Sequence, residues 1–140
     1  MKVFVDTNVI ADWLIPTNTF HAEATDFMKL CLQRKVYACV SSHSLTDLFY
    51  ITRKYFNSNE RYTFIRLLIS RLGVLTEDAA VFSTALKNSV LADLEDALQI
   101  ACAEREGVDF IVTENLKDFT SSKIPTVSIK SALEKVANML

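Results

Sequence analysis

Four aspartates stand at positions from which their carboxylates could hold a divalent cation. Asp6 directly follows the apolar residues 3–5, so its side chain emerges at the end of a predicted strand. Asp93 and Asp96 lie three residues apart at the start of a helical pattern, where they share one helix face. Asp47 lies early in another helical pattern. Hard divalent cations prefer carboxylate oxygens, so these residue types predict a cation site.

Each of these aspartates also has a purely structural interpretation. Asp6 could be the N-cap of the helix that follows its strand, a role that Thr7 or Asn8 could fill equally well. Asp93 could cap its own helix, with Asp96 as a first-turn acid, and Asp47 could be a solvated first-turn acid. Taken one at a time, the four residues leave both interpretations open.

Another polar group follows the apolar residues 110–112. Thr113 and Asn115 come after this run, at the same predicted edge of the sheet as Asp6, and could bind metal-bound water or phosphate. For Asp118 we expect a different role, the capping of a short helical turn.

Five short apolar runs predict the strands that would position these side chains, at residues 3–5, 36–40, 74–75, 110–112 and 127–129. Longer stretches with helical periodicity separate the runs. Strands that are apolar throughout and alternate with helices form parallel sheets covered on both faces. The predicted fold class is therefore α/β, with three layers, a central parallel sheet of about five strands, and a single domain over residues 1–140.

The two glycines of the chain restrict the motifs that it can contain. With Gly73 and Gly107 alone, neither the dinucleotide-binding pattern G-x-G-x-x-G nor the phosphate-binding pattern G-x-x-x-x-G-K-[ST] can be written. Both glycines stand between a helical pattern and a strand, and we predict a left-handed helix C-cap at each.

Helix boundaries are predicted from capping residues and apolar periodicity. Thr76 stands before two acids and predicts an N-cap for a helix that runs to about Lys87. Ser42 or Ser44 predicts the start of another helix. In the helix that begins near Asp93, four residues are expected to pack inward: Leu94, Ala97, Leu98 and Ala101.

The composition is that of a packed globular protein, which we expect to be cytoplasmic. Half of the 140 residues are hydrophobic and 23% are charged, and Asp6 interrupts the apolar N-terminus too early for a signal sequence. No segment approaches the roughly 18 apolar residues of a membrane span. An odd number of cysteines without a C-x-x-C pair predicts reduced, mostly buried thiols at Cys31, Cys39 and Cys102.

The net charge of −2 gives no general attraction to nucleic acid. Setting aside the four aspartates of the candidate cation site leaves 15 basic residues against 13 of the 17 acidic ones, a balance of +2. The acidity would then be local to the site, where bound cations would reverse it.

The four polar segments, in this order and spacing, resemble the PIN-domain ribonucleases, including the VapC-type toxins, over nearly the whole chain. Residues 3–9 (VFVDTNV) look like the opening motif of the family, residues 41–48 like its second acidic segment, residues 93–99 like its third, and residues 111–115 like its closing motif. The resemblance implies a PIN-like fold and hydrolysis of RNA phosphodiester bonds with Mg²⁺ or Mn²⁺. It also implies a homodimer and a small antitoxin protein that blocks the site.

On this resemblance, Asp6 and Asp96 are the main metal ligands, while Asp93 and Asp47 orient metal-bound water or hold a second ion. Supporting or substrate-contacting roles fall to three residues: Asn8, Thr113 and Asn115. The assignment agrees with the general chemistry, because divalent cations activate water and stabilise charge on phosphate oxygens.

The chain departs from the family pattern at two positions. Asp47 stands where glutamate is usual and is one methylene shorter, and Asn115 stands where aspartate is common and carries no charge. We therefore expect a weaker second metal site. The alternative function is a PIN-like module with little or no catalysis that binds RNA or a protein partner, and a phosphatase or DNA nuclease with the same carboxylates is a third possibility.

Three cations near aromatic residues could contact RNA: Arg53, Lys54 and Arg61. We favour a packing role for the neighbouring rings, in a helical hairpin or a dimer interface. His21 and His43 are isolated in the sequence, and we expect surface or hydrogen-bonded core histidines rather than ligands.

Overall fold

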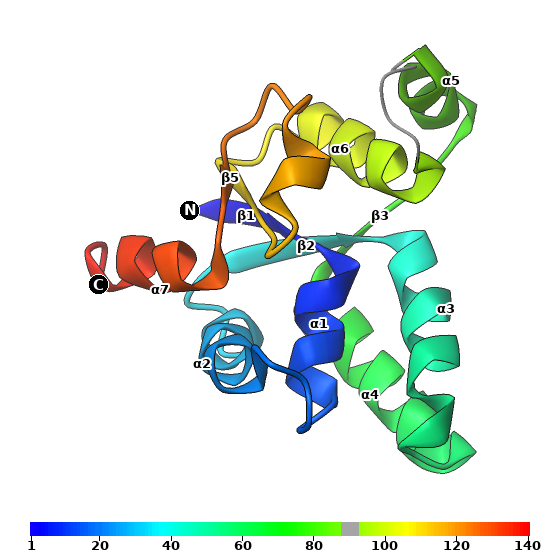
Figure 1. Cartoon of the computed structure of the whole chain (residues 1–140), viewed down its shortest axis with the longest axis vertical. Coiled ribbons are helices and arrows are strands. Elements are labelled where there is room, and N and C mark those ends of the chain that lie inside the picture. Colours follow the sequence, from blue (N-terminus) through cyan, green and yellow to red (C-terminus); the bar gives the residue numbers. More distant parts are fainter. Residues whose placement is uncertain (88–92) are drawn as a thin grey trace.

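A five-stranded parallel sheet forms the centre of the molecule, and helices cover both of its faces (Figure 1). The computed structural model describes residues 1–87 and 93–140, and the elements named here lie within these ranges. The strands are β1 (Lys2–Val5), β2 (Tyr37–Ser41), β3 (Gly73–Leu75), β4 (Phe110–Val112) and β5 (Thr126–Val127). Their order is β3-β2-β1-β4-β5, and each neighbouring pair is parallel. The predicted three-layer α/β fold is confirmed.

The helices divide into two layers. They are α1 (Thr7–Leu14), α2 (His21–Leu32), α3 (Ser42–Ile51), α4 (Ser58–Arg71), α5 (Ala79–Lys87), α6 (Leu94–Glu106) and α7 (Ile129–Ala137), with short 3₁₀ turns η1 (Thr52–Lys54) and η2 (Leu116–Phe119). In Figure 1, α5 and α6 lie on one side of the sheet, and α1, α2, α3, α4 and α7 lie on the other. No helix in the described ranges is long and apolar enough to cross a bilayer.

Alternation along the central strands supplies both layers with apolar side chains. Val3 and Val5 belong to the core under α1, α2 and α7, whereas Phe4 between them packs into the core under α5 and α6. β2 and β4 alternate in the same way. All three cysteines are free and buried as predicted, with Cys31 in the first core and Cys39 and Cys102 in the second.

The strand order produces a crevice at one end of the sheet. β1 lies between β2 and β4, so the chain builds β2 and β3 on one side of it and later returns to form β4 and β5 on the other. At such a switch in direction the connections after neighbouring strands diverge and leave room for a ligand. Asp6 directly follows β1 and Thr113 directly follows β4, so both lie at this crevice.

The two glycines have different roles. Gly107 ends α6 with φ = 70° and is the predicted left-handed C-cap. The same prediction for Gly73 is wrong, because Gly73 is the first residue of β3 and does not have a positive φ. A Cβ at position 73 would lie 2.8 Å from the hydroxyl of Tyr37, so glycine there permits close packing on β2.

Two further predicted boundaries and one predicted core residue need correction. Thr76 does not cap α5: the helix begins at Ala79, and the Asp78 carboxylate accepts a hydrogen bond from the N–H of Val81 instead. The last strand ends before Ile129, because Ser128 caps α7. Leu94 does not pack inward, since it is 47% exposed, although the other three residues predicted with it are buried.

We predict that Gly107→Ala destabilises the protein by about 1–2 kcal/mol, because a Cβ strains the left-handed conformation. Nothing lies within 4 Å of the added carbon, so the loss would come from backbone strain alone. Urea unfolding measures it. Gly107→Asn is the matched control and should lose less, because asparagine tolerates this conformation; equal losses for the two variants would contradict the explanation.

Candidate active site

A cleft of about 350 Å³ opens at the carboxyl ends of β1 and β4. Its lining is dominated by carboxylates and carboxamides, contributed by segments far apart in the sequence. The lining residues are Asp6, Thr7, Asn8, Asp47, Tyr50, Ile51, Asp93, Glu95, Asp96, Gln99, Asn115 and Asp118. The structure thus brings together all four predicted aspartates and both predicted asparagines.

Asp6 is the buried floor of the cleft, with 1% of its surface exposed. Its Oδ1 accepts a hydrogen bond from the Gln99 side-chain amide at 3.1 Å, and its Oδ2 accepts one from the Thr113 hydroxyl at 2.8 Å. Asp6 occupies the N-cap position of α1 but makes no side-chain capping bond, so its carboxylate is not used as a helix cap. Burial raises the pKa of Asp6, and the two hydrogen bonds partly oppose that rise.

Gln99 connects Asp6 to the neighbouring helices. Its side-chain oxygen accepts a hydrogen bond from the N–H of Thr7 at 3.2 Å, while its amide donates to Asp6. The Thr7 hydroxyl is 2.6 Å from the hydroxyl of Ser44 on α3. One network therefore holds α1, α3 and α6 in place around the carboxylate. Gln99 was not predicted, although its position three residues after Asp96 places it on the same helix face.

Asp93 and Asp96 lie at the start of α6, close enough for their charges to interact. Asp93 is the N-cap, because its Oδ1 accepts hydrogen bonds from the N–H groups of Glu95 at 2.8 Å and Asp96 at 3.3 Å, yet it also lines the cleft. Burial, together with the charges of Asp93, Asp6 and Asp118, raises the pKa of Asp96 to about 6.

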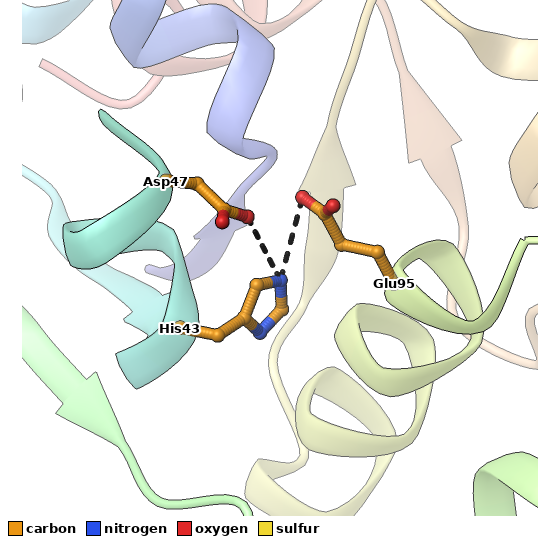
Figure 2. A group of neighbouring side chains, drawn as sticks. All are labelled: His43, Asp47 and Glu95. Carbon is orange, nitrogen blue, oxygen red and sulfur yellow. Dashed lines mark ion pairs between the residues drawn. The ribbon is translucent and has the colours of Figure 1, made fainter. Parts of the chain in front are cut away.

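Asp47 and Glu95 meet on the wall of the cleft beside His43 (Figure 2). Burial raises the pKa of Glu95 to about 7, helped by its contact with Asp47. Oδ2 of Asp47 is buried without a hydrogen-bond partner among the described residues. His43 is hydrogen-bonded to Glu77, as expected of a histidine in the core, and Asp47 and Glu95 lie near its other ring nitrogen. Glu95 was not predicted as a site residue.

The segment after β4 supplies one residue that supports Asp6 and two that line the cleft. Thr113 lies beneath Asp6 rather than in the cleft lining, and its hydroxyl also accepts a hydrogen bond from the N–H of Asn115 at 2.9 Å. Asp118 does not cap η2, because Asn115 occupies the N-cap position and Asp118 lies within the turn. Since Asp118 lines the cleft, the negative charge that Asn115 lacks is present after all.

The three cations predicted to contact RNA do not line the cleft in the described structure. The guanidinium of Arg61 lies 4.2 Å from the ring centre of Phe49 and donates to the Phe49 carbonyl, so it joins α4 to α3. Arg53 stacks 3.8 Å from the ring centre of Tyr50, a cleft residue, and Lys54 is exposed in η1. The favoured packing role of the rings is present in two pairs: Phe49 with Tyr62 and Phe56 with Phe64.

Comparison with known proteins adds a family and a set of relatives. The family model described as "PIN domain" matches residues 2–117. Ribonuclease VapC1 from Aquifex aeolicus is 27% identical over 138 residues, which cover 96% of this chain and 94% of the relative. Among solved structures, VapBC-1 from nontypeable Haemophilus influenzae superposes with a TM-score of 0.70 at 18% identity, over 93% of this chain and 99% of the other. DNA-bound VapBC from Salmonella typhimurium superposes with a TM-score of 0.68 at 21% identity, over 92% of this chain and 98% of the other.

We predict that Thr113→Val destabilises the protein by about 1–3 kcal/mol, because it leaves a buried acceptor on Asp6 and the N–H of Asn115 unpaired. The same change should raise the pKa of Asp6, which carboxyl NMR titration can follow. Thr84→Val removes a hydroxyl from an exposed helix position and is the matched control. Unchanged stability and an unchanged Asp6 titration in Thr113→Val would contradict the network.

We predict that the metal-free protein becomes less stable as the pH rises from about 4 to about 6, the interval between an ordinary aspartate pKa and that of Asp96. In this interval the folded chain holds a proton that the unfolded chain has released, so raising the pH favours unfolding. Asp96→Asn should flatten the slope, and Asp26→Asn, an exposed acid on α2, should leave it unchanged. Urea unfolding across pH 4 to 7 tests this, and equal slopes in the three proteins would exclude it.

Proposed function

This chain belongs to the PIN-domain family, and from that membership we propose that it is a metal-dependent endoribonuclease. The observation that carries the proposal is the cleft at the switch point of the sheet, in which Asp6, Asp47 and Asp96 are brought together. The relative named Ribonuclease VapC1, aligned over nearly the full length of both chains, supports RNA as the substrate. The carboxylates also support phosphodiester hydrolysis, a reaction that many sites of this composition perform with divalent cations.

The donor set of the cleft fits Mg²⁺ or Mn²⁺. The lining offers carboxylate and carboxamide oxygens, which are the ligands of hard divalent cations, and the buried Oδ2 of Asp47 has no partner in the described structure. We assign Asp6 and Asp96 as the principal ligands, with Asp47, Asp93 and Asp118 as further oxygen donors. Such an ion, when bound, activates water and stabilises negative charge on phosphate oxygens.

The protein's own residues prepare the cleft for this ligand set. The Gln99 amide and the Thr113 hydroxyl hold the two oxygens of Asp6 in fixed positions, so this carboxylate needs no rearrangement to bind. The carboxamides of Asn8 and Asn115 lie on the rim as uncharged donors that could bind a phosphate oxygen without adding to the negative charge. Without cations, the negative charge of the cleft would repel the RNA backbone. Bound cations would remove this repulsion and allow RNA to enter.

We further propose that the chain is a toxin that forms a homodimer and is blocked by a small antitoxin. The structures named VapBC-1 and VapBC, which share its fold, support this assignment. Tyr50 and Ile51 line the cleft and are 63% and 36% exposed, so a partner that covered the cleft would also bury apolar surface. The buried free thiols are compatible with the reducing cytoplasm, where we place the protein. We also propose that residues 1–140 form a single domain.

The test is cleavage of single-stranded and structured RNA by the purified chain with Mg²⁺ or Mn²⁺. We expect cleavage that EDTA abolishes. Asp6→Asn and Asp96→Asn should each reduce it by more than about 100-fold, because substitutions of residues that only support the metal ligands typically cost roughly 10- to 100-fold. Asp26→Asn, which is exposed on α2, should cleave like the parent.

Two outcomes would overturn this function. If cleavage survives both substitutions unchanged, the cleft is not the catalytic site. If the parent binds Mn²⁺ in a calorimetric titration but cleaves no RNA, the chain is a binding module, the alternative that Asp47 and Asn115 suggested. Phosphomonoesters and DNA, offered in parallel, distinguish the remaining reactions of the same carboxylates.

A further inference from the structure

A group of side chains at one end of the cleft has a donor set different from that of the Asp6 and Asp96 site. His43 and Asp47 lie one turn apart on α3, Glu95 lies in the first turn of α6, and their side chains converge (Figure 2). Nε2 of His43 is 3.9 Å from Oδ2 of Asp47 and 3.5 Å from Oε1 of Glu95. The group combines one imidazole nitrogen with two carboxylate oxygens, a set that suits transition-metal ions.

The imidazole of His43 is held from behind by a buried carboxylate. Nδ1 of His43 is 2.9 Å from Oε2 of Glu77, whose side chain is 7% exposed. Oε1 of Glu77 accepts hydrogen bonds from the N–H of His43 at 2.8 Å and the hydroxyl of Ser42 at 3.0 Å, so Glu77 is itself fixed. With the proton on Nδ1 donated to Glu77, the lone pair of Nε2 is directed at Asp47 and Glu95. This carboxylate–histidine arrangement orients many metal-binding histidines.

Two of the three atoms that face one another in this group lack hydrogen-bond partners among the described residues. Nε2 of His43 and Oδ2 of Asp47 are both buried and unpaired among the described residues. Buried polar atoms without partners are rare and costly in folded proteins. The 3.5 and 3.9 Å separations are too long for hydrogen bonds between these groups, but an ion between them would satisfy both atoms.

The separations also indicate the geometry of the ion. Two ligands of a tetrahedral ion with bonds of about 2.0–2.1 Å lie roughly 3.4 Å apart, whereas right-angle ligands at the same bond length lie about 2.9 Å apart. The observed 3.5 Å matches the tetrahedral value, and the 3.9 Å requires only a small inward movement of Asp47. Three protein ligands leave a fourth position open toward the cleft.

We propose that His43, Asp47 and Glu95 bind a divalent transition-metal ion of the Zn²⁺ type, with Glu77 positioning the imidazole. This site differs from the all-oxygen site of Asp6 and Asp96 in its donor atoms, and Asp47 is shared by the two sites. The proposal does not depend on ribonuclease activity, because it concerns the affinity of the folded chain for a metal ion alone.

The test uses Co²⁺ as a probe of the full-length, metal-free chain, because tetrahedral Co²⁺ absorbs visible light far more strongly than octahedral Co²⁺. We expect one equivalent of Co²⁺ to produce an intense visible band that Zn²⁺ abolishes by displacement and that excess Mg²⁺ leaves in place. His43→Gln and Glu95→Gln should lose the band, and Glu77→Gln should weaken binding by about 10-fold. His21→Gln, at a histidine that contacts the Asp12 carbonyl, and Asp6→Asn should both retain it.

The result that overturns the proposal is equally direct. The proposal is wrong if the parent shows no intense band, or if His43→Gln and Glu95→Gln keep the band while Asp6→Asn loses it. Circular dichroism establishes that each variant is folded. If His43→Gln is not folded, Glu95→Gln decides, because the Glu95 side chain is 45% exposed. RNA cleavage that fails in Asp6→Asn while the Co²⁺ band persists would separate this site from the proposed catalytic one.

Discussion

The buried carboxylate of Asp6 accepts hydrogen bonds from Gln99 on α6 and from Thr113 at the end of β4, and the positions of both layers around the cleft depend on these two bonds. The main-chain N–H of Asp6 donates to the carbonyl of Val112, so the ends of β1 and β4 are joined at the same residue. An ionised acid at this depth is costly unless its oxygens are paired. The elements that supply the partners are therefore fixed relative to one another, and the cleft above Asp6 takes its shape from them.

Above that floor the fold crowds like charges. Asp96 and Glu95 titrate at about 6 and about 7, because burial and neighbouring carboxylates disfavour their ionised forms. A bound cation removes this repulsion. The free energy that the repulsion costs the metal-free chain is regained on binding and strengthens the affinity for the ion. At one end of the wall the imidazole of His43 offers nitrogen in place of oxygen as a donor, and the proposed second ion rests on this difference.

The parts of this structure that were predictable from sequence are those determined by local pattern. Continuous apolar runs specified the parallel strands, and an acid directly after β1 placed Asp6 at the crevice. Gly73 and Gly107 share the same local pattern, yet Tyr37 on the neighbouring strand decides the role of Gly73. His43 looked isolated because its partner Glu77 lies 34 residues away. Asp118 reaches the cleft only because η2 turns back toward it, which no local capping signal indicates. The missed features of the site depend on contacts between distant segments, whereas the misplaced start of α5 and end of β5 are errors of local capping.

The placement of the three cysteines divides the protein into two chemically distinguishable halves. Cys31 lies in the core between the sheet and α2, whereas Cys39 and Cys102 lie on the opposite face beneath α5 and α6. Burial raises the pKa of the thiols of Cys31 to about 12 and of Cys39 to about 11, so neither reacts as a thiolate while its core is closed. Each thiol thus reports the opening of its own layer, and the order in which they become modifiable records which layer separates from the sheet first.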